Sequence, residues 1–538
     1  MRRSLYILLT AGLLFVANVS TAQKRRVYID HSDSLVSNVG VAKNADRLIG
    51  NVIVRHMGAI MHCDSAYFYS NENKVDAFGR IHITQGDTVD LKGNSLVYDG
   101  NTALAIIRGN VELKDPSLVL TTDELEYNLE HGMAYYNTGG TIVDSLNTLN
   151  SRVGRYYSED KMLFFKDSVH LVNKDFIMDS DTLKYDTEHK IVYISGPTTV
   201  NGDSGYLYSE LGWYETISQN AELYKNSRMG NEKQELRCDT LLYDKLRGQA
   251  WAYHHVEIED FKSMLEIRGE IGEYNEHSEE GMVTKKAELL QYSEKDTLFL
   301  HADTLRTYPM ADSIADKKIF LAYNKVRFYR KDMQGKCDSL VYSAQDSVMR
   351  MYFEPIVWAM NNQMTADSIT YANQPKGADL LKLYTDAFMV SKDSLDMYNQ
   401  ISGKNMVGYI VNNSLDVLDV IGNGETIYYV KDKSGMMGVN KAECSNIKIK
   451  MKENKIYRIS FITQPKMDFF PPADFGNQDL KLPLFRWEEA IRPKSPEDIF
   501  NYEAYDDGKE VERNIVDQIS KKEILEKVRK SLRQSDKK

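Results

Sequence analysis

The chain has 538 residues, a formal net charge of −11, 34 tyrosines and 11 prolines. The negative charge argues against a nucleic-acid partner, which would require a basic face. A chain of this length normally forms several domains unless it is built from repeats. Six of the prolines lie beyond residue 464, so the chain before that point can form strands without losing ladder hydrogen bonds.

The first 22 residues have the three-part layout of a secretory signal peptide. Arg2 and Arg3 precede an apolar run from Leu5 to Val19, and Ser20-Thr21-Ala22 forms a small-residue exit. The apolar run is shorter than the roughly 20 residues that a membrane-spanning helix needs. We therefore expect cleavage after Ala22 and export of the mature chain, with a transmembrane anchor as the alternative.

A cassette of the form apolar, polar, small, Asp, Ser or Thr, apolar, any, Tyr recurs along the chain, most clearly in residues 178–185 and 236–243. The Asp position is occupied in turn by Asp64, Asn94, Asp123, Arg152, Asp181, Glu210, Asp239, Glu270, Asp303, Asp338 and Asp367. Most of the intervals are 29 residues and none is shorter. This regularity predicts a stacked array of about eleven repeats.

The columns of the repeat predict which side chains face the interior. An apolar residue stands three positions before the Asp in every copy except at Gly335, and nothing larger than Thr directly precedes the Asp. The residue four positions after it is usually Tyr. Because side chains alternate along a strand, the apolar residues on the two sides of the Asp share one interior only if the strand bends there. We therefore predict a bulge or a sharp bend at the Asp position.

We interpret the repeated aspartates as structural residues of this corner, whose carboxylates accept hydrogen bonds from nearby backbone N–H groups. The predicted corner residues are Asp64, Asp123, Asp181, Asp239, Asp338 and Asp367. Catalytic acid pairs are the alternative, but an active site is rarely copied in every repeat. A second apolar segment follows each cassette, as in 75–83 and 105–113, with a central Gly or Asn that suggests another bend. Each repeat thus supplies two bent strand stretches, stacked either as one coil or as two antiparallel strands.

The cysteines and histidines do not indicate a disulfide, a metal site or a catalytic site. Cys63, Cys238 and Cys337 share the small-residue column but lie several repeats apart, too far for a disulfide, and we expect them to fill small spaces. The pairing of Cys444, in a separate segment, stays open. The pair His254-His255 would point to opposite faces of a strand, which disfavours joint metal binding. We predict no catalytic residue, no cofactor and no metal site.

The C-terminal part departs from the repeat. Residues 393–464 still have strand patterns and are expected to form a terminal β-segment of the stack. The Pro-rich stretch 465–497 predicts an extended linker. The charged tail 498–538 has apolar residues at helical spacing after Asn514, which predicts a short amphipathic helix. That helix could dock on a partner or on the end of the stack itself.

The cassettes and their glycine-containing continuations, such as Leu96-Val97-Tyr98 leading to 108–113, resemble the OstA-like (LptA) family of periplasmic lipopolysaccharide-bridge proteins. Residues 401–409 and 420–426 are also similar to it, and the resemblance extends over about 27–465, with the repeat region itself at 27–392. The resemblance implies an all-β fold, an elongated twisted jelly-roll folded like a taco, or a solenoid of two-strand repeats. Its apolar groove would shield the acyl chains of lipid A while lipopolysaccharide crosses the periplasm.

In that fold the candidate lining of the groove is formed by the apolar residues two positions after the Asp and the tyrosines four positions after it. The candidates are Leu96, Tyr98, Leu125, Tyr127, Leu183, Tyr185, Leu241, Tyr243 and Leu340. The same side chains could instead pack against one another in a closed core. The implied partners are lipopolysaccharide and its lipid A, other transport components with OstA-like or jelly-roll domains, and a second copy joined end to end through an unpaired strand edge.

Two other functions remain open. The first is a structural or adhesive β-solenoid of the cell envelope with a closed core. The second is a carbohydrate-active β-helix enzyme, against which stands the absence of a non-repeated acidic cluster. The leading hypothesis is a non-enzymatic, periplasmic lipid-binding protein.

Overall fold

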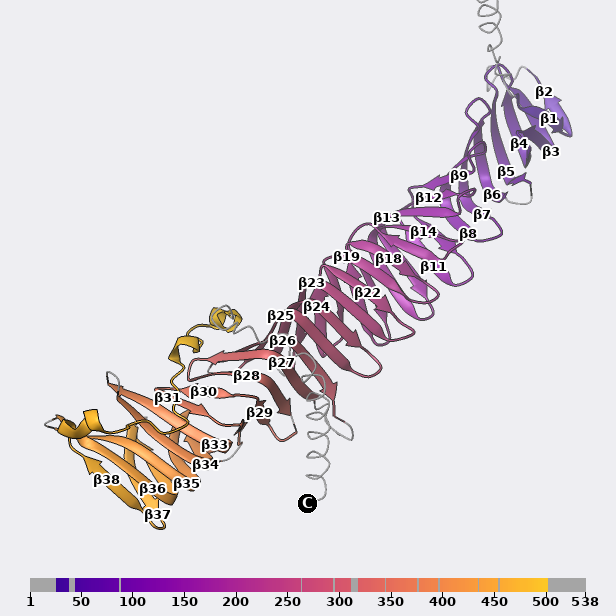
Figure 1. Cartoon of the computed structure of the whole chain (residues 1–538). Coiled ribbons are helices and arrows are strands. Elements are labelled where there is room, and N and C mark those ends of the chain that lie inside the picture. The colour runs from indigo at the N-terminus through magenta and orange to yellow at the C-terminus, as the bar shows by residue number, and fades with distance from the viewer. Residues whose placement is uncertain are drawn as a thin grey trace, which may run out of the picture. The chain divides into compact units, whose positions relative to one another are not determined.

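The structure is a computed structural model of the chain (Figure 1). It describes residues 26–37, 44–86, 89–262, 264–293, 296–310, 318–343, 345–374, 377–394, 397–433, 435–452 and 455–501. The predicted signal peptide and the predicted C-terminal helix lie outside these residues. Most described residues form antiparallel strands, so the all-β fold is confirmed. No helix in the described ranges has the length and apolarity needed to span a bilayer.

The chain divides after Ala250 into two compact units, and the division falls within the predicted repeat region. Unit 1 contains β1 (Tyr28–His31), β2 (Ser34–Val36), β3 (Asp46–His56), β4 (Ala59–Tyr69), β5 (Lys74–Gln85), β6 (Val89–Asp99), β7 (Leu104–Lys114), β8 (Val119–Asn128), β9 (Met133–Tyr136), β10 (Gly140–Val143), β11 (Asn147–Ser151), β12 (Val153–Tyr157), β13 (Met162–Asn173), β14 (Phe176–Asp186), β15 (Ile191–Ile194), β16 (Thr198–Gly202), β17 (Gly205–Ser209), β18 (Leu211–Glu215), β19 (Ala221–Lys225), β20 (Ser227–Gly230), β21 (Gln234–Cys238), β22 (Thr240–Asp244) and the first residues of β23 (Gln249–Asp260).

Unit 1 is a ladder of bent rungs, each antiparallel to the next (Figure 1). Strands β3 to β8 pair in sequence order. Further along, one rung is often formed by two short strands on either side of a corner. For example, β11 and β12 both pair with β13. Each repeat therefore adds two antiparallel rungs, which is the second of the two stacking alternatives.

The strands bend at the Asp position, as the columns predict. The register of β4 against β5 shifts between His62 and Ser65, around Asp64. The register of β6 against β7 shifts in the same way between Lys92 and Ser95, around Asn94. In β4 the buried positions Met61 and Cys63 precede the bend and buried Ala66 follows it, so both halves of the strand face one interior.

The alternate rungs bend differently, through two consecutive residues with positive φ. Gly79 and Arg80 have φ of 76° and 44°, and Gly109 and Asn110 have φ of 79° and 47°. Glycine and asparagine tolerate this left-handed conformation best. Other pairs adopt it too: Asp167–Ser168, His254–His255, Lys285–Lys286, Asn324–Lys325, Phe353–Glu354, Thr385–Asp386 and Gly422–Asn423. The conformation recurs even where the residue types do not.

The two kinds of corner are joined by a repeated backbone hydrogen bond. The N–H of Asp33 donates to the carbonyl oxygen of Gly50 at 2.9 Å. The N–H of Asp367 donates in the same way to Thr385 at 3.1 Å. Because each bend would otherwise leave a ladder donor unpaired, this bond satisfies the backbone where the strand pairing is interrupted.

Unit 2 contains the rest of the chain from Trp251. Its strands are the remainder of β23, β24 (Leu265–Asn275), β25 (Glu280–Tyr292), β26 (Thr297–Pro309), β27 (Lys318–Arg330), β28 (Met333–Ser343), β29 (Val348–Tyr352), β30 (Ile356–Ala359), β31 (Asn362–Thr365), β32 (Ser368–Ala372), β33 (Asp379–Ser394), β34 (Met397–Val411), β35 (Ser414–Asp432), β36 (Gly435–Lys452), β37 (Lys455–Ile462) and β38 (Lys466–Phe470). Three short 3-10 helices follow: η1 (Pro472–Asn477), η2 (Glu489–Ile491) and η3 (Pro496–Phe500). The predicted terminal β-segment, 393–464, runs from the end of β33 to two residues beyond β37.

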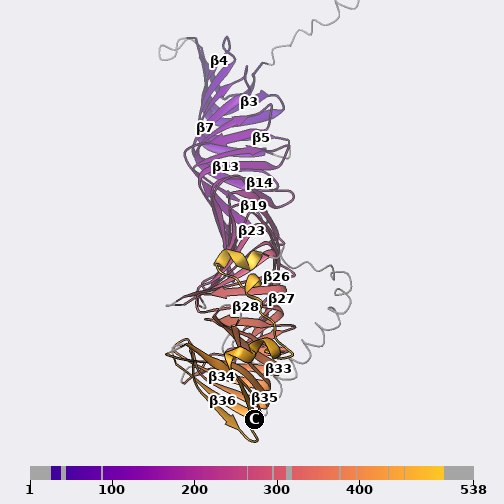
Figure 2. The same cartoon turned by 60° about the vertical axis from the view of Figure 1, so that its left-hand side comes forward.

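The Pro-rich stretch does not form the extended linker that its composition predicts. Residues 471–501, which we call the strap, lie across the outer face of unit 2 (Figure 2). Leu482 packs with Phe388 and Val390, and Ile491 packs with Ile356 and Trp358. The apolar residues between the prolines therefore bury surface that a solvated linker would leave exposed. The prolines still prevent the strap from joining the sheet as a regular strand.

Candidate functional site

The nine predicted lining residues all lie in the interior and are buried, none more than 8% exposed. Eight of them belong to unit 1, and Leu340 belongs to β28 of unit 2. In this structure the interior is therefore filled by the chain's own side chains. This is the closed-core arrangement that the sequence left open beside an open groove.

The leucines two positions after the Asp, which we call the leucine column, continue into apolar residues of the strands between the cassettes. Leu96 on β6 lies opposite Ile107 on β7, which in turn lies opposite Leu125 on β8. Further along unit 1, Leu183 lies between Phe165 and Ile194 on its two neighbouring strands. The intervening rungs thus add apolar side chains to the same row, and the row continues from one repeat to the next.

The tyrosine column alternates with small or aliphatic residues on the intervening rungs. Ala105 lies opposite both Tyr98 and Tyr127, and Ala134 lies opposite both Tyr127 and Tyr156. Large and small side chains thus alternate along the column, which allows neighbouring rungs to pack closely. A related adjustment occurs at Gly154, where any Cβ would overlap the Tyr136 ring.

Two tyrosine hydroxyls of the column, those of Tyr156 and Tyr185, anchor loops of the preceding repeat. Tyr185 donates to Asp144 Oδ2 at 2.7 Å, and Lys190 Nζ donates to the same oxygen at 2.8 Å. One repeat earlier, Tyr156 and Lys161 donate to Asp115, the lysine at 3.1 Å. The Tyr98 hydroxyl instead hydrogen bonds to His56 Nδ1 at 2.5 Å.

These contacts set the charge state of the two buried aspartates, Asp115 and Asp144. Burial alone would raise the pKa of each carboxyl group. The hydrogen bonds that each accepts from side chains and backbone outweigh burial and hold its pKa below the ordinary value. Burial raises the pKa of Tyr127 and Tyr136 to about 12, so both stay protonated. The hydrogen bonds to Asp115 and Asp144 therefore hold these interior side chains in position.

The predicted corner aspartates lie at the bends, with partly or fully exposed side chains. Arg80 Nε donates to Asp64 Oδ1 at 2.9 Å, and Ser339 Oγ donates to Asp338 Oδ2 at 2.8 Å. These carboxylates thus accept hydrogen bonds from side chains, whereas the prediction named backbone N–H groups. At Asp338 and Asp367 the repeated contact is made by the backbone N–H of the aspartate itself. The corner depends on the backbone conformation more than on the carboxylate, which agrees with Arg152 and Glu210 occupying the same position.

The cysteines and the histidine pair also have structural positions. Cys63, Cys238, Cys337 and Cys444 are all buried, and burial raises the pKa of the Cys63 thiol to about 11. A thiol that stays protonated at neutral pH is a poor nucleophile. His254 and His255 form one of the left-handed corners and are exposed. In the described part of the chain, no group of three or more His, Cys, Asp or Glu side chains has the arrangement of a metal site.

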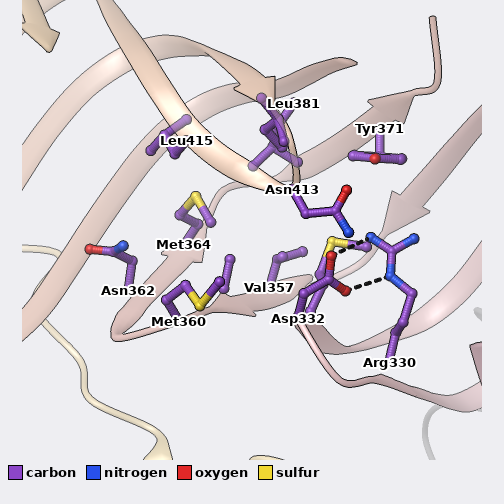
Figure 3. A pocket seen from close by; sticks show the side chains of 13 residues that line it. Arg330, Asp332, Val357, Met360, Asn362, Met364, Tyr371, Leu381, Asn413 and Leu415 are labelled. Carbon is purple, nitrogen blue, oxygen red and sulfur yellow. Dashed lines mark hydrogen bonds and ion pairs between the residues drawn. The ribbon is translucent and has the colours of Figure 1, made fainter. Parts of the chain in front are cut away.

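A pocket in unit 2 opens beside three hairpin turns (Figure 3). Asp332, Met360 and Asn413 come from these turns, and buried Met364 and Leu381 belong to the interior cluster of the unit. Arg330 lines the pocket as well, with its Nε 2.6 Å from Asp332 Oδ1. The pocket therefore connects a polar rim with the apolar interior at the edge where the rungs turn.

Sequence reasoning missed the glutamines that hold the strap. Gln400 Nε2 donates to the Leu480 carbonyl at 2.9 Å, and the N–H of Leu482 donates to Gln400 Oε1 at 2.8 Å. Gln363 forms the same two bonds with Arg486 and Glu488, at 2.9 and 2.7 Å. The sequence contains one sign of this shared role. Gln334 and Gln363 both stand four residues before the Asp of their cassettes.

Gln334 extends the series through a different contact. Its Oε1 accepts hydrogen bonds from Arg492 Nε and Nη2, at 2.9 and 2.7 Å. Arg327 then donates to the carbonyl of Asn501, and the Phe500 ring lies 4.6 Å from the ring of His301. The strap is thus fixed along its length by side chains of successive rungs of unit 2.

Comparison with known proteins places the chain in a family. A family model described as OstA-like protein matches residues 24–181 and 185–297, just over half of the chain. The match ends well short of residue 392, the predicted end of the repeat region. No curated protein matches the chain.

Among solved structures, one match is the crystal structure of LptH from Pseudomonas aeruginosa, described as the LptA homologous periplasmic component of the conserved lipopolysaccharide transport device. The identity is 13% and the TM-score 0.19, with 24% of this chain and 94% of that chain covered. The family match, which does not depend on this structure, agrees with the cassettes and their two bent rungs. The chain belongs to the OstA-like family.

Proposed function

We propose that this protein is a periplasmic, non-enzymatic carrier in lipopolysaccharide transport, whose β-interior shields the acyl chains of lipid A. The observation that carries the proposal is the continuous apolar row of unit 1, in which Leu96, Ile107 and Leu125 follow one another on paired strands. Each CH₂ group exposed to water costs about 0.8 kcal/mol, so a continuous apolar path lowers the barrier to moving an acyl chain along it. Membership of the OstA-like family supports the same role.

Because the interior is filled in this structure, acyl chains enter by displacing side chains at the edge where the rungs turn. The pocket of unit 2 supports this route, since Met360 and Met364 are unbranched side chains that repack readily. At its rim the guanidinium of Arg330 is paired with Asp332, so the rim is polar without a net charge from this pair. The transfer breaks no covalent bond, so it requires no catalytic residue, cofactor or metal.

The partners in this proposal are lipopolysaccharide itself and other transport components with OstA-like or jelly-roll domains. Strand addition at the edge of unit 1 supplies the contact with such a domain, because β1 and β2 are short and expose Tyr28 and Leu35. A second copy could use the same edge. The mature protein begins after Ala22 in this proposal, which mass spectrometry of the periplasmic chain would test.

Site-specific photo-crosslinking tests the lipid-binding role. A photoreactive residue replaces Leu183 in the mature chain, which is then mixed with lipopolysaccharide and irradiated. A matched control carries the same residue at Ile177, which lies on the same strand but is exposed on the outer face. We expect labelling at position 183 to exceed that at 177 severalfold. Equal labelling at the two positions would remove the lipid-binding proposal.

The second candidate function is a structural β-solenoid of the cell envelope with a permanently closed core. The burial of all nine predicted lining residues favours it. The same crosslinking experiment separates the two functions, because a closed core leaves position 183 unlabelled while the fold stays intact. A position in the pocket, such as Met360, provides an independent readout in unit 2.

A further inference from the structure

The outer face of unit 1 carries a row of aromatic and cationic side chains on consecutive rungs. The row, which we call the outer row, consists of Tyr135, Arg155, Phe164, Lys184, Tyr193 and Trp213. Each member lies directly opposite the next on the neighbouring strand. At about 4.8 Å per strand, the six side chains form a narrow strip that crosses the rungs.

The outer row faces away from the interior. Phe164 is 41% exposed and Tyr193 is 37% exposed, whereas their chain neighbours Leu163, Phe165 and Ile194 are buried. The cations lie against the rings. Arg155 Cζ is 5.5 Å from the centre of the Tyr135 ring, and Lys184 Nζ is 5.4 and 5.2 Å from the rings of Phe164 and Tyr193. These cation–π contacts place both positive charges beside the rings at the surface.

The two cations differ from most others on unit 1 because they have no carboxylate partner. Arg55 pairs with Asp30 at 3.1 Å, and Arg108 pairs with Glu124 at 2.5 Å. Within the described ranges, neither Arg155 nor Lys184 forms an ion pair with a carboxylate. The outer row reaches Glu126 at one end and Glu222 at the other, and no acidic residue stands between Tyr135 and Trp213. In a chain with net charge −11, this strip therefore presents two surface cations in the absence of an intervening carboxylate within the row.

We propose that the outer row binds the phosphorylated sugar portion of lipopolysaccharide, an inference that rests on the proposed function. Exposed aromatic rings stack against the C–H faces of pyranose rings, and Arg155 and Lys184 bind phosphate groups. The two cations stand two strands apart, at about 10 Å, so they engage separate phosphates.

Lipopolysaccharide is favoured over a free polysaccharide by the location of the strip. Phe164 and Lys184 lie on the same strands as Phe165 and Leu183, whose side chains belong to the apolar row of the interior. Sugars attached to acyl chains in these rungs emerge at the edge where the rungs turn, and from there they fold back over the outer face of the same rungs. The second contact then forms at a high effective concentration and adds to the affinity of the first.

Binding of a delipidated, phosphorylated core oligosaccharide to the mature full-length chain tests this proposal by calorimetry. The oligosaccharide lacks acyl chains, so its binding does not depend on the interior. We expect R155Q/K184Q and F164A/Y193A each to weaken binding about ten-fold or more, the loss of roughly 1.4 kcal/mol. The conservative variant R155K/K184R should retain most of the affinity. Dephosphorylated oligosaccharide should bind the unaltered chain at least ten-fold more weakly.

The matched control is K92Q/R108Q, which removes two outer-face cations that have carboxylate partners. It should bind the oligosaccharide as the unaltered chain does. Unchanged binding by R155Q/K184Q, or equal binding of the dephosphorylated sugar, would overturn the outer row as a saccharide site. If the oligosaccharide fails to bind while lipopolysaccharide still crosslinks at position 183, the outer-row proposal fails and the transport proposal stands. If the oligosaccharide binds but lipopolysaccharide does not crosslink at position 183, the outer row is a saccharide site and the transport proposal fails.

Discussion

Lys190 Nζ donates a hydrogen bond to Asp144 Oδ2 at 2.8 Å, joining residues 46 apart in sequence. The two side chains are 15% and 2% exposed. Lys161 and Asp115 form the same pair one repeat earlier, at 3.1 Å and with the same separation. In both cases a tyrosine of the interior column donates to the same carboxylate, which links the buried ion pair to the core.

Removal of one partner should therefore be costly. We expect Asp144→Ala to lower the free energy of unfolding by about 3 kcal/mol, because it leaves the Lys190 ammonium and the Tyr185 hydroxyl without a buried acceptor. The midpoint of urea unfolding of the mature chain measures the change. Glu112→Gln is the control, since Glu112 pairs with Lys92 at the surface, and it should cost less than about 0.5 kcal/mol. Similar midpoints for the two variants would contradict the role of the buried pair.

The same carboxylates predict a pH dependence. Asp115 and Asp144 have pKa values lowered in the folded chain, so the unfolded chain binds more protons between the folded and the unfolded pKa. Their contribution to stability is complete above the unfolded pKa of about 3.9 and is lost as the pH falls through the folded pKa. Thermal unfolding measured from pH 6 downward should show this loss. Replacement of both residues by Asn should flatten the curve below about pH 4, and an unaltered slope would contradict the assignment.

A single glutamine substitution should loosen the strap locally. Gln363→Ala removes two hydrogen bonds to Arg486 and Glu488 and leaves their backbone groups partly buried, which costs about 2 kcal/mol locally. Hydrogen exchange of strap peptides, followed by mass spectrometry, should accelerate by more than ten-fold, while exchange in unit 1 stays unchanged. Gln291→Ala, at an exposed position of β25, is the control. Unchanged exchange in the strap would show that apolar packing alone holds it.

A larger residue in place of Gly154, beside the tyrosine column, should destabilise the chain. A Cβ at Gly154 would overlap the Tyr136 ring, so Gly154→Ala should destabilise the chain by about 1 to 3 kcal/mol. Gly196→Ala is the matched control, because a Cβ there meets its nearest neighbour at 3.6 Å, an ordinary contact. Thermal unfolding of the two variants would test this. Equal melting temperatures would mean that the Tyr136 ring moves aside without cost.

Much of the fold was predictable because the repeat has a fixed period and a column of small residues. The position of Asp64 between two apolar sets of opposite parity requires a bend, and the structure has one there. The second bend was harder to define. It is formed by residue pairs such as Gly79–Arg80, Asp167–Ser168 and Lys285–Lys286, which share positive φ angles but no residue type. Composition therefore indicates this corner only where glycine or asparagine occupies it.

The strap and the outer row were not predictable for a different reason. Proline content indicated a linker, whereas the packing of the strap depends on Leu482 and on single glutamines of distant strands. The outer row becomes visible only when the register of the strands places Phe164 beside Lys184. Both features arise from pairings between residues far apart in sequence, which a one-dimensional pattern does not specify.

The link between Asp144 and Tyr185 spans 41 residues, as does the link between Asp115 and Tyr156. Loss of one whole module of 29 residues between Asp115 and Tyr185 would place them 41 residues apart, the separation that Asp115 and Tyr156 now have. Duplication or loss of entire modules during evolution would therefore preserve these cross-links, whereas an insertion of any other length would break them. The length of such a stack could therefore change in steps of one module while the packing of its interior stays the same.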